Sequence, residues 1–124
     1  MKTSRLKKRS KQKITIDIVD RKLQDWFRKT YPKAKCESCG KTFYCMHHHL
    51  PKSRSNAGRY NHENLVFICH ACHSEISFNG GSQVIARYSA RKGVEWVKKM
   101  DNLAKERKQY YTKKELEEIA KLYE

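Results

Sequence analysis

The feature that most restricts how this chain can fold is a pair of C-x-x-C motifs, Cys36–Cys39 and Cys69–Cys72. Gly40 follows the first pair, as in a zinc knuckle, where glycine supplies an unusual backbone angle. Nothing at the N-terminus resembles a secretory signal peptide, so we expect a reducing, cytoplasmic setting in which paired cysteines bind metal rather than form disulfides. The sequence therefore predicts a structural Zn(II) held by these four cysteines: Cys36, Cys39, Cys69 and Cys72. The fifth cysteine, Cys45, is expected to be a strand residue.

Composition explains why a metal would be needed and which partner it favours. Only 38% of the residues are hydrophobic and 33% are charged, so the apolar core is small. A small core usually needs a disulfide or a structural metal for stability. The formal net charge is +15, which favours a polyanion, nucleic acid first. We expect no membrane partner, because no segment is apolar enough to span a bilayer and no helix places Lys and Trp on opposed faces.

Local patterns predict an α+β fold. Two short β-favouring runs, Thr42–Cys45 and Leu65–Ile68, lie between or beside the cysteines, and helical periodicity predicts helices around them. The predicted helices are residues 18–31, with Asp17 as N-cap and Pro32 as stop; a stretch after Cys72 through Ile76; residues 82–91, between Ser82 and Gly93; residues 95–110; and a last helix opened by a Thr112–Glu115 capping box.

The same patterns predict the organisation of the chain. Residues 1–13 contain seven Lys or Arg, and we expect them to form a disordered basic arm. Residues 14–124 are expected to form a single domain, with a motif core at 36–78 and a helical tail at 82–124.

The histidines carry the chemistry of the motif core. Three adjacent histidines, His47, His48 and His49, precede Asn64, and His73 follows Asn64 by nine positions. Together with the cysteine pairs, this pattern resembles the HNH endonuclease motif in its four-cysteine zinc-knuckle variant. The resemblance covers residues 36–78 and implies a zinc-knuckled ββα-metal (His-Me finger) core, flanked by an N-terminal helix and C-terminal helices.

The resemblance also implies a role for each residue. His47 and His73 would bind a catalytic divalent ion (Mg(II), Mn(II) or another), His48 would be the general base, and Asn64 would hold His48 or its loop in place. A neutral imidazole can accept a proton near pH 7, since its unperturbed pKa is about 6.5. Successive helical side chains diverge by about 100°, so Cys72 can face the zinc while His73 faces the second ion.

The register within the three histidines is decided by the resemblance alone. A strand places His47 and His49 on one face and His48 on the other, so geometry does not choose between them. The family form, base-x-x-Pro, selects His48 through Pro51. The competing register, with His48 as ligand and His49 as base, stays open. His62 and His70 fit no position of the motif and are expected to be surface or loop histidines.

The remaining sequence bears on the substrate. Lys52, Arg54 and Arg59 lie in the loop between the predicted strands, where they could contact phosphates. The helical tail resembles that of the phage recombination protein NinG (Rap) family, which implies a phage or prophage protein that acts on branched DNA in a host cell. We therefore expect a metal-dependent DNA endonuclease or nickase, as a homodimer if it cuts both strands. The alternatives are a non-catalytic zinc-dependent nucleic-acid-binding module and an HNH protein that assists phage DNA packaging.

Overall fold

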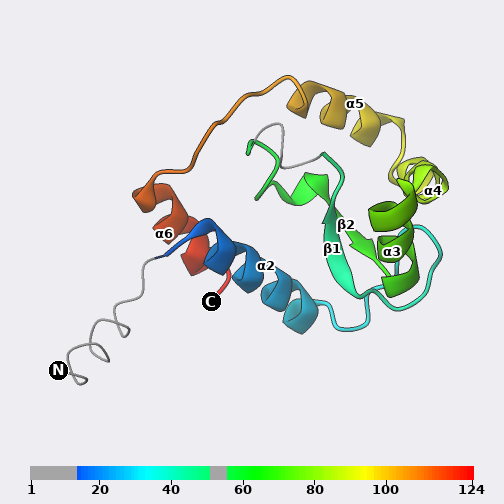
Figure 1. The fold of residues 1–124 in the computed structure, drawn as a ribbon, viewed down its shortest axis with the longest axis horizontal. Helices are drawn as coiled ribbons and strands as arrows, with labels where there is room; N and C mark the ends of the chain where they lie inside the picture. The colour runs from blue at the N-terminus through cyan, green and yellow to red at the C-terminus, as the bar shows by residue number, and fades with distance from the viewer. Residues whose placement is uncertain (1–13, 51–55) are drawn as a thin grey trace.

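The computed structural model describes residues 14–50 and 56–124. In that part of the chain the elements follow one another as α2 (Ile16–Thr30), β1 (Cys45–His48), the 3-10 helix η1 (His62–Asn64), β2 (Leu65–Ile68), α3 (His70–Asn79), α4 (Ser82–Lys92), α5 (Val94–Leu103) and α6 (Lys113–Leu122). This confirms the α+β fold class (Figure 1). The predicted basic arm and the loop residues Lys52 and Arg54 lie outside the described residues. None of the described helices has both the length and the apolar composition needed to span a membrane.

The two strands form an antiparallel hairpin in which His48 lies opposite Leu65. β2 has the predicted bounds, but the prediction of Thr42–Cys45 for the first strand is wrong, because β1 begins at Cys45. The main chain before Cys45 pairs with the cysteine region instead: the Phe43 N–H donates to the Ala34 carbonyl at 3.1 Å. The strand is thereby displaced along the chain and carries two of the adjacent histidines.

Helix α2 begins earlier than predicted. Thr15, not Asp17, is its N-cap, and the Thr15 hydroxyl accepts a hydrogen bond from the Ile18 N–H at 3.3 Å. Asp17 lies in the first turn, where a carboxylate interacts favourably with the helix dipole. The helix ends at Thr30, before Pro32, because a residue that precedes proline disfavours helical angles.

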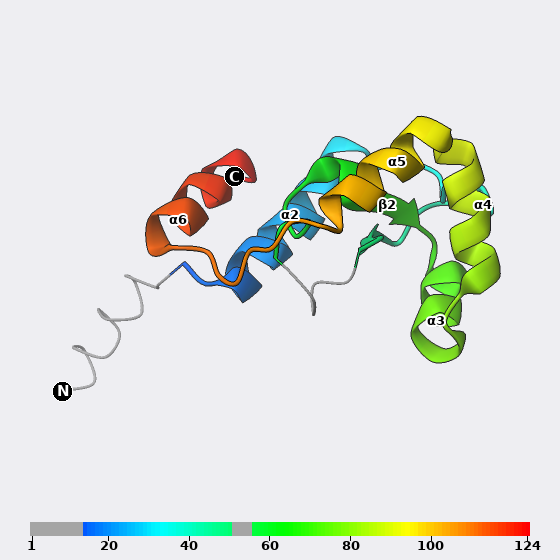
Figure 2. The same ribbon diagram turned by 90° about the horizontal axis from the view of Figure 1, so that it is seen from above.

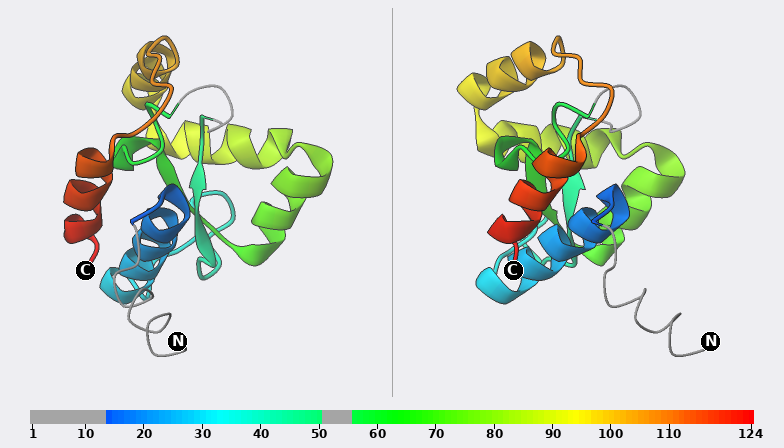
Figure 3. Two further views of the ribbon diagram at one scale, coloured as in Figure 1. Left: turned by 60° about the vertical axis from the view of Figure 1, so that its left-hand side comes forward. Right: turned by 90° about the vertical axis from the view of Figure 1, so that its left-hand side faces the viewer.

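Helix α6 lies beside α2 (Figure 3). The predicted capping box is confirmed: the Glu115 N–H donates to Thr112 Oγ1 at 3.1 Å, and the Thr112 N–H donates to Glu115 Oε1 at 2.9 Å. The two helices bury apolar side chains against each other and against the hairpin; these are Val19, Leu116 and Ala120 in one cluster and Leu23, Phe27, Met46, Leu65 and Tyr123 in the next.

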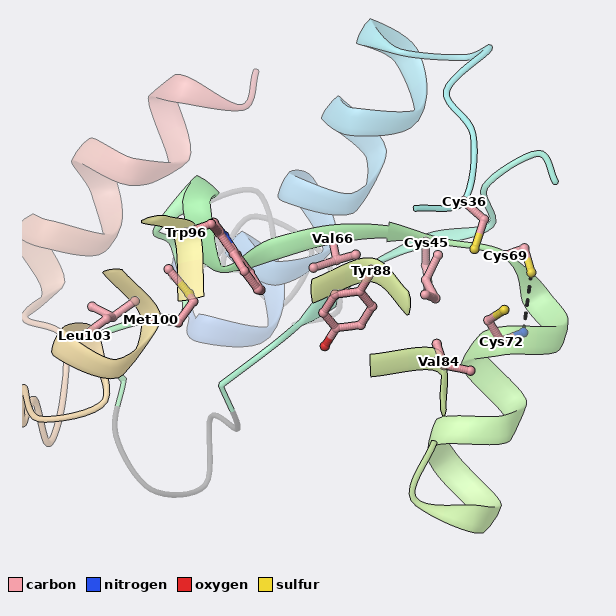
Figure 4. Close-up of a cluster of buried hydrophobic side chains, with 11 residues drawn as sticks. Cys36, Cys45, Val66, Cys69, Cys72, Val84, Tyr88, Trp96, Met100 and Leu103 are labelled. Atoms are coloured by element: carbon pink, nitrogen blue, oxygen red, sulfur yellow. Dashed lines mark hydrogen bonds between the residues drawn. The ribbon is translucent and has the colours of Figure 1, made fainter. Parts of the chain in front are cut away.

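Helices α3, α4 and α5 cover the other side of the hairpin. Their buried side chains form one cluster with the strands and the cysteines (Figure 4); from the helices it includes Val84, Tyr88, Trp96, Met100 and Leu103. The prediction of a helix to residue 110 is wrong, since α5 ends at Leu103. Beyond it, the main-chain carbonyls of Lys108 and Gln109 accept hydrogen bonds from Asn56, which holds this segment extended against the loop that precedes η1.

The hairpin thus lies between two groups of helices, with α2 and α6 at one end of the molecule and α3 and α4 at the other (Figure 2). β2 occupies one edge of β1, and α2 lies along the other. Gln24 of α2 completes that edge: its side-chain amide donates to the Met46 carbonyl at 3.0 Å and accepts from the Met46 N–H at 2.9 Å. Helix α2 is therefore fixed against the strand that carries the histidines.

Candidate functional site

The four cysteines of the two C-x-x-C pairs meet at one end of the hairpin. The Sγ atoms of Cys36, Cys39, Cys69 and Cys72 all lie within 4.8 Å of one another, and Cys39 Sγ is 3.4 Å from Cys69 Sγ. Tetrahedral Zn(II) with Zn–S bonds of about 2.3 Å places its sulfurs about 3.8 Å apart, so the spacing fits this ion. Among the described residues no other His, Cys, Asp or Glu side chains form a group of three or more at this spacing. Cys45 lies outside the cluster, buried in β1, as predicted.

The backbone of the knuckle favours the thiolate form of one of these cysteines, Cys36. Gly40 has a φ of 83°, the left-handed angle that the first motif predicts. The Cys72 N–H donates to Cys69 Sγ at 3.4 Å (Figure 4). Burial tends to raise the pKa of Cys36, but hydrogen bonds from the backbone of Cys39, Cys69 and Ser38 outweigh it and lower this pKa to about 7. Burial and the neighbouring thiols instead raise the pKa of Cys72 to about 12. A thiolate is the ligand form of cysteine, and a cation among the four sulfurs would favour that form, so the spacing of the four sulfurs carries the fit to zinc.

The histidines meet in a different place, a cavity of about 490 Å³ that is lined by α2 and β1. His47 and His48 reach it from the strand, and His73 reaches it from α3. Cys72 contributes to the cysteine cluster while the next residue, His73, lines the cavity. One helix start therefore serves both places.

His47 is suited to be a neutral ligand. Burial, together with the charges of His48, His49 and His73, lowers the pKa of His47 to about 4. An imidazole with this pKa is unprotonated at neutral pH and keeps a lone pair for a metal ion.

A hydrogen bond to the main chain orients the ring of His48. Its Nε2 lies 2.8 Å from the Arg59 carbonyl oxygen. A carbonyl can only accept, so Nε2 carries the hydrogen and Nδ1 of the neutral ring is the nitrogen that can take up a proton.

His49 points away from the cavity. Its Nδ1 is hydrogen-bonded to the Tyr88 hydroxyl at 2.7 Å, and its ring lies 4.8 Å from that of Trp96, on the α4 and α5 side of the hairpin. Burial lowers the pKa of His49 as well. This geometry supports the register in which His48 rather than His49 is the base.

Asn64 is fully buried and does not line the cavity. Its Oδ1 accepts from the Leu50 N–H at 2.8 Å, and its Nδ2 donates to the Gly58 carbonyl at 3.1 Å. These two residues stand at either end of the loop that follows β1. The side chain thus joins the two ends of the loop, which is the kind of role that the motif implies for this asparagine.

The predicted phosphate-contacting residues receive unequal support. Lys52 and Arg54 are outside the described residues. The Arg59 guanidinium is mostly buried, with Nη1 2.6 Å from Asp20 Oδ2 and Nε 3.0 Å from Asn56 Oδ1. A phosphate would have to compete with Asp20 for this side chain.

The two other histidines lie at the surface, as predicted, and outside the cavity. His70 contacts Tyr44, with ring centroids 5.0 Å apart. His62 is more integrated than predicted, because it is hydrogen-bonded to the Tyr123 hydroxyl at the end of α6.

The sequence reasoning missed the contribution of α2 to the cavity. Asp20, Gln24 and Arg28 line it from this helix, opposite the histidines. Arg28 is the one Lys or Arg among the described residues that line it, and its Nε donates to the Tyr44 carbonyl at 3.3 Å. These three polar residues are spaced four apart, which places them on one face of the helix. This spacing is the sequence pattern from which a polar helix face toward the site could have been predicted.

A hairpin followed at once by a helix, with a cysteine cluster at one end and a histidine-lined cavity along its edge, defines a small ββα metal-binding module. Residues 36–78 match the family model described as HNH endonuclease. This part of the chain, about a third of its length, is similar to the HNH endonuclease family, and its four-cysteine cluster fits the zinc knuckle that the resemblance implies. At the level of the family, the match supports nuclease activity with DNA as substrate. No curated protein and no solved structure matches the chain.

Proposed function

We propose that this protein is a divalent-metal-dependent DNA endonuclease or nickase. The observation that carries the proposal is the meeting of His47, His48 and His73 in one cavity within the segment that matches the HNH endonuclease family. These are the side chains that the motif implies as ligand, base and ligand.

The chemistry would divide between the residues as follows. A divalent ion bound by His47 and His73 would neutralise charge on the scissile phosphate and on the leaving oxygen. His48 Nδ1 would accept the proton of a water molecule whose oxygen forms the new bond to phosphorus, as the bond to the 3′-oxygen breaks. The Arg59 carbonyl would keep the His48 ring in the tautomer that this step requires. Asn64 would hold the loop on which Arg59 lies.

The cysteine cluster would supply stability rather than chemistry. In a chain with so few apolar residues, zinc binding contributes directly to the free energy of folding. DNA would be attracted by the net charge of +15, to which the arm of residues 1–13 contributes seven cationic side chains. Of the residues predicted to contact phosphates, Lys52 and Arg54 remain the stronger candidates, because Arg59 is paired with Asp20.

The finer assignments follow from the NinG-like tail. We infer a phage or prophage enzyme in the host cytoplasm that prefers branched DNA, as a homodimer if both strands are cut. The packaging-associated HNH protein remains the enzymatic alternative. The non-catalytic zinc module is the alternative from another class.

The test is cleavage of supercoiled plasmid and of a four-way junction with Mg(II), with Mn(II) or with no added ion. The metal-free arm should use dialysed protein rather than a chelator, since a chelator would also remove the zinc. Ion-dependent cleavage that His48→Ala abolishes is the expected result. DNA binding without cleavage under every condition would favour the non-catalytic module. Faster cleavage within the duplex arms of the four-way junction than at its branch point would contradict the preference for branched DNA.

A further inference from the structure

A mostly buried ion pair joins α2 to the residue that holds the candidate base. Arg59 Nη1 lies 2.6 Å from Asp20 Oδ2, and the two side chains are 14% and 25% exposed. Asp20 precedes the segment that matches the HNH family, so this pair lies partly outside the motif. At this burial the loss of one partner leaves a charge that water screens poorly, so the pair constrains the chain strongly.

The main chain of Arg59 is what His48 contacts. The same residue whose guanidinium binds Asp20 offers its carbonyl oxygen to His48 Nε2 at 2.8 Å. Arg59 therefore links the two groups: its side chain is held by Asp20, and its main-chain carbonyl orients the imidazole of His48.

The segment of residues 56–59 is also held by contacts on the side away from α2. Arg59 Nε donates to Asn56 Oδ1 at 3.0 Å, and Asn56 is itself bound to the chain beyond α5 through the carbonyls of Lys108 and Gln109, both at 2.9 Å. These contacts fix the Asn56 end of the segment. The ion pair with Asp20 then fixes the position of the Arg59 end, next to α2.

We propose that Asp20 is a positioning residue of the candidate site: through the Arg59 side chain, it sets the carbonyl that fixes the ring orientation and tautomer of His48. This rests on the proposed function. It assigns α2 a role in the reaction that the family match does not include. It also explains why Arg59 is directed toward Asp20 instead of toward solvent.

Asp20 also lines the cavity, so a direct contact with the metal ion or the substrate is the competing explanation. The geometry favours positioning, because among the described residues Asp20 forms no ligand group of three with the cavity histidines. The two explanations differ in one respect: positioning acts through Arg59, and direct contact does not.

The experiment compares Asp20→Asn, Arg59→Gln and the double variant, with Asp20→Glu as the conservative form. Asp17→Asn is the matched control, because Asp17 is an exposed carboxylate on the same helix and does not line the cavity. Steady-state cleavage of a plasmid with saturating Mg(II) gives kcat and KM. Long-range ¹H–¹⁵N spectra of the zinc-loaded protein, recorded at one pH without Mg(II), report the tautomer of His48.

Each single variant should lower kcat by about tenfold to 10²-fold, the effect of a small misplacement of a reacting group, while KM changes little. The double variant should be no worse than the singles, because both break the same link, and Asp20→Glu should recover most of the loss. The single variants should also lose the predominance of the Nε2–H tautomer. Additive losses in kcat, or an unchanged tautomer in Arg59→Gln, would overturn the proposal.

The tautomer measurement does not depend on cleavage. If the native protein cuts no DNA, the proposed function fails, but the spectra still test whether Asp20 and Arg59 set the ring of His48. If Asp20→Asn does not fold, Arg59→Gln and Asp20→Glu carry the comparison, and equal activity of Arg59→Gln and the native protein would reject it.

Discussion

The side chain of Asn64 occupies the space that a side chain at position 58 would need. A Cβ built on Gly58 would lie 2.7 Å from Asn64 Nδ2, the atom that donates to the Gly58 carbonyl at 3.1 Å. The close approach of the two residues closes the loop between β1 and η1. Glycine is needed here for space rather than for an unusual angle, since Gly58 is not among the glycines with positive φ.

Gly58→Ala should therefore destabilise the protein by about 1–3 kcal/mol, the usual cost of overpacking a well-packed site. Asn64 would have to move, and with it the loop end that carries Arg59, so cleavage should fall as well. Urea denaturation of the zinc-loaded protein measures the first effect. In an Asn64→Ala background the same substitution should cost less, because the clashing amide is gone; the same cost in both backgrounds would refute the clash.

The two registers of the triple histidine predict opposite results. His48→Ala should lower kcat by about 10²-fold or more while DNA affinity stays near that of the native protein, since a general base acts in the transition state. His49→Ala should instead lower the melting temperature, because it removes the hydrogen bond to Tyr88 and the contact with Trp96. The cleavage activity of both variants is measured well below their melting temperatures. An inactive His49→Ala beside a nearly native His48→Ala would reverse the register.

Removal of one zinc ligand should unfold the protein. Cys72→Ser leaves three thiolates and a thin core, and zinc binding is a large part of the folding free energy in such a domain. Elemental analysis should find about one tightly bound zinc per chain in the native protein, and circular dichroism should show loss of helix in the variant. Cys45→Ala is the control, because Cys45 is buried but outside the cluster, and it should keep its zinc. A folded, zinc-free Cys72→Ser protein would rule out the stapling role.

Much of this site could be predicted because it is encoded locally. The cysteine pairs, the capping box of Thr112 and Glu115, and the run Leu65–Ile68 are short patterns whose geometry follows from spacing alone. The match to the HNH family has the bounds that the motif predicts, residues 36–78.

What could not be predicted depends on contacts between distant segments. From the sequence, Gln24 is a polar residue on the exposed face of a helix. Its role appears only when α2 is placed against β1, where its amide forms hydrogen bonds with the strand edge. From the sequence, Arg59 is a basic loop residue, and its ion pair with Asp20 depends on how α2 is placed. The start of β1 shifted because Phe43 pairs with Ala34 in the knuckle, a contact that no propensity in the run Thr42–Cys45 reveals.

The interface between η1 and α6 should respond to pH. His62 is hydrogen-bonded to the Tyr123 hydroxyl and packs against Trp26, and burial lowers the pKa of His62. The unfolded chain has the ordinary value of about 6.5, so it binds more protons than the folded protein below that pH. The contribution of His62 is thus present above about pH 6.5 and is lost as the pH falls through the lower folded pKa. Melting temperatures at stepwise lower pH, with zinc in excess, should fall less steeply in His62→Gln; an identical slope would contradict this assignment.

Arg28 should contact the DNA backbone at the cavity. It is the cationic side chain that lines the cavity from α2, and the Tyr44 carbonyl orients its guanidinium through Nε. Its ion pair with Asp25 is exposed and long, at 3.4 Å, so Arg28→Ala should leave the melting temperature almost unchanged. The variant should raise KM and reduce the slope of log K against log salt by about 0.9, the value of one phosphate contact on duplex DNA. Lys29→Ala removes the same charge from the next position, which is exposed and does not line the cavity. If cation density on α2 alone mattered, the two variants would change slope and KM equally; a larger effect of Arg28→Ala on KM is what a contact with the cleaved phosphate requires.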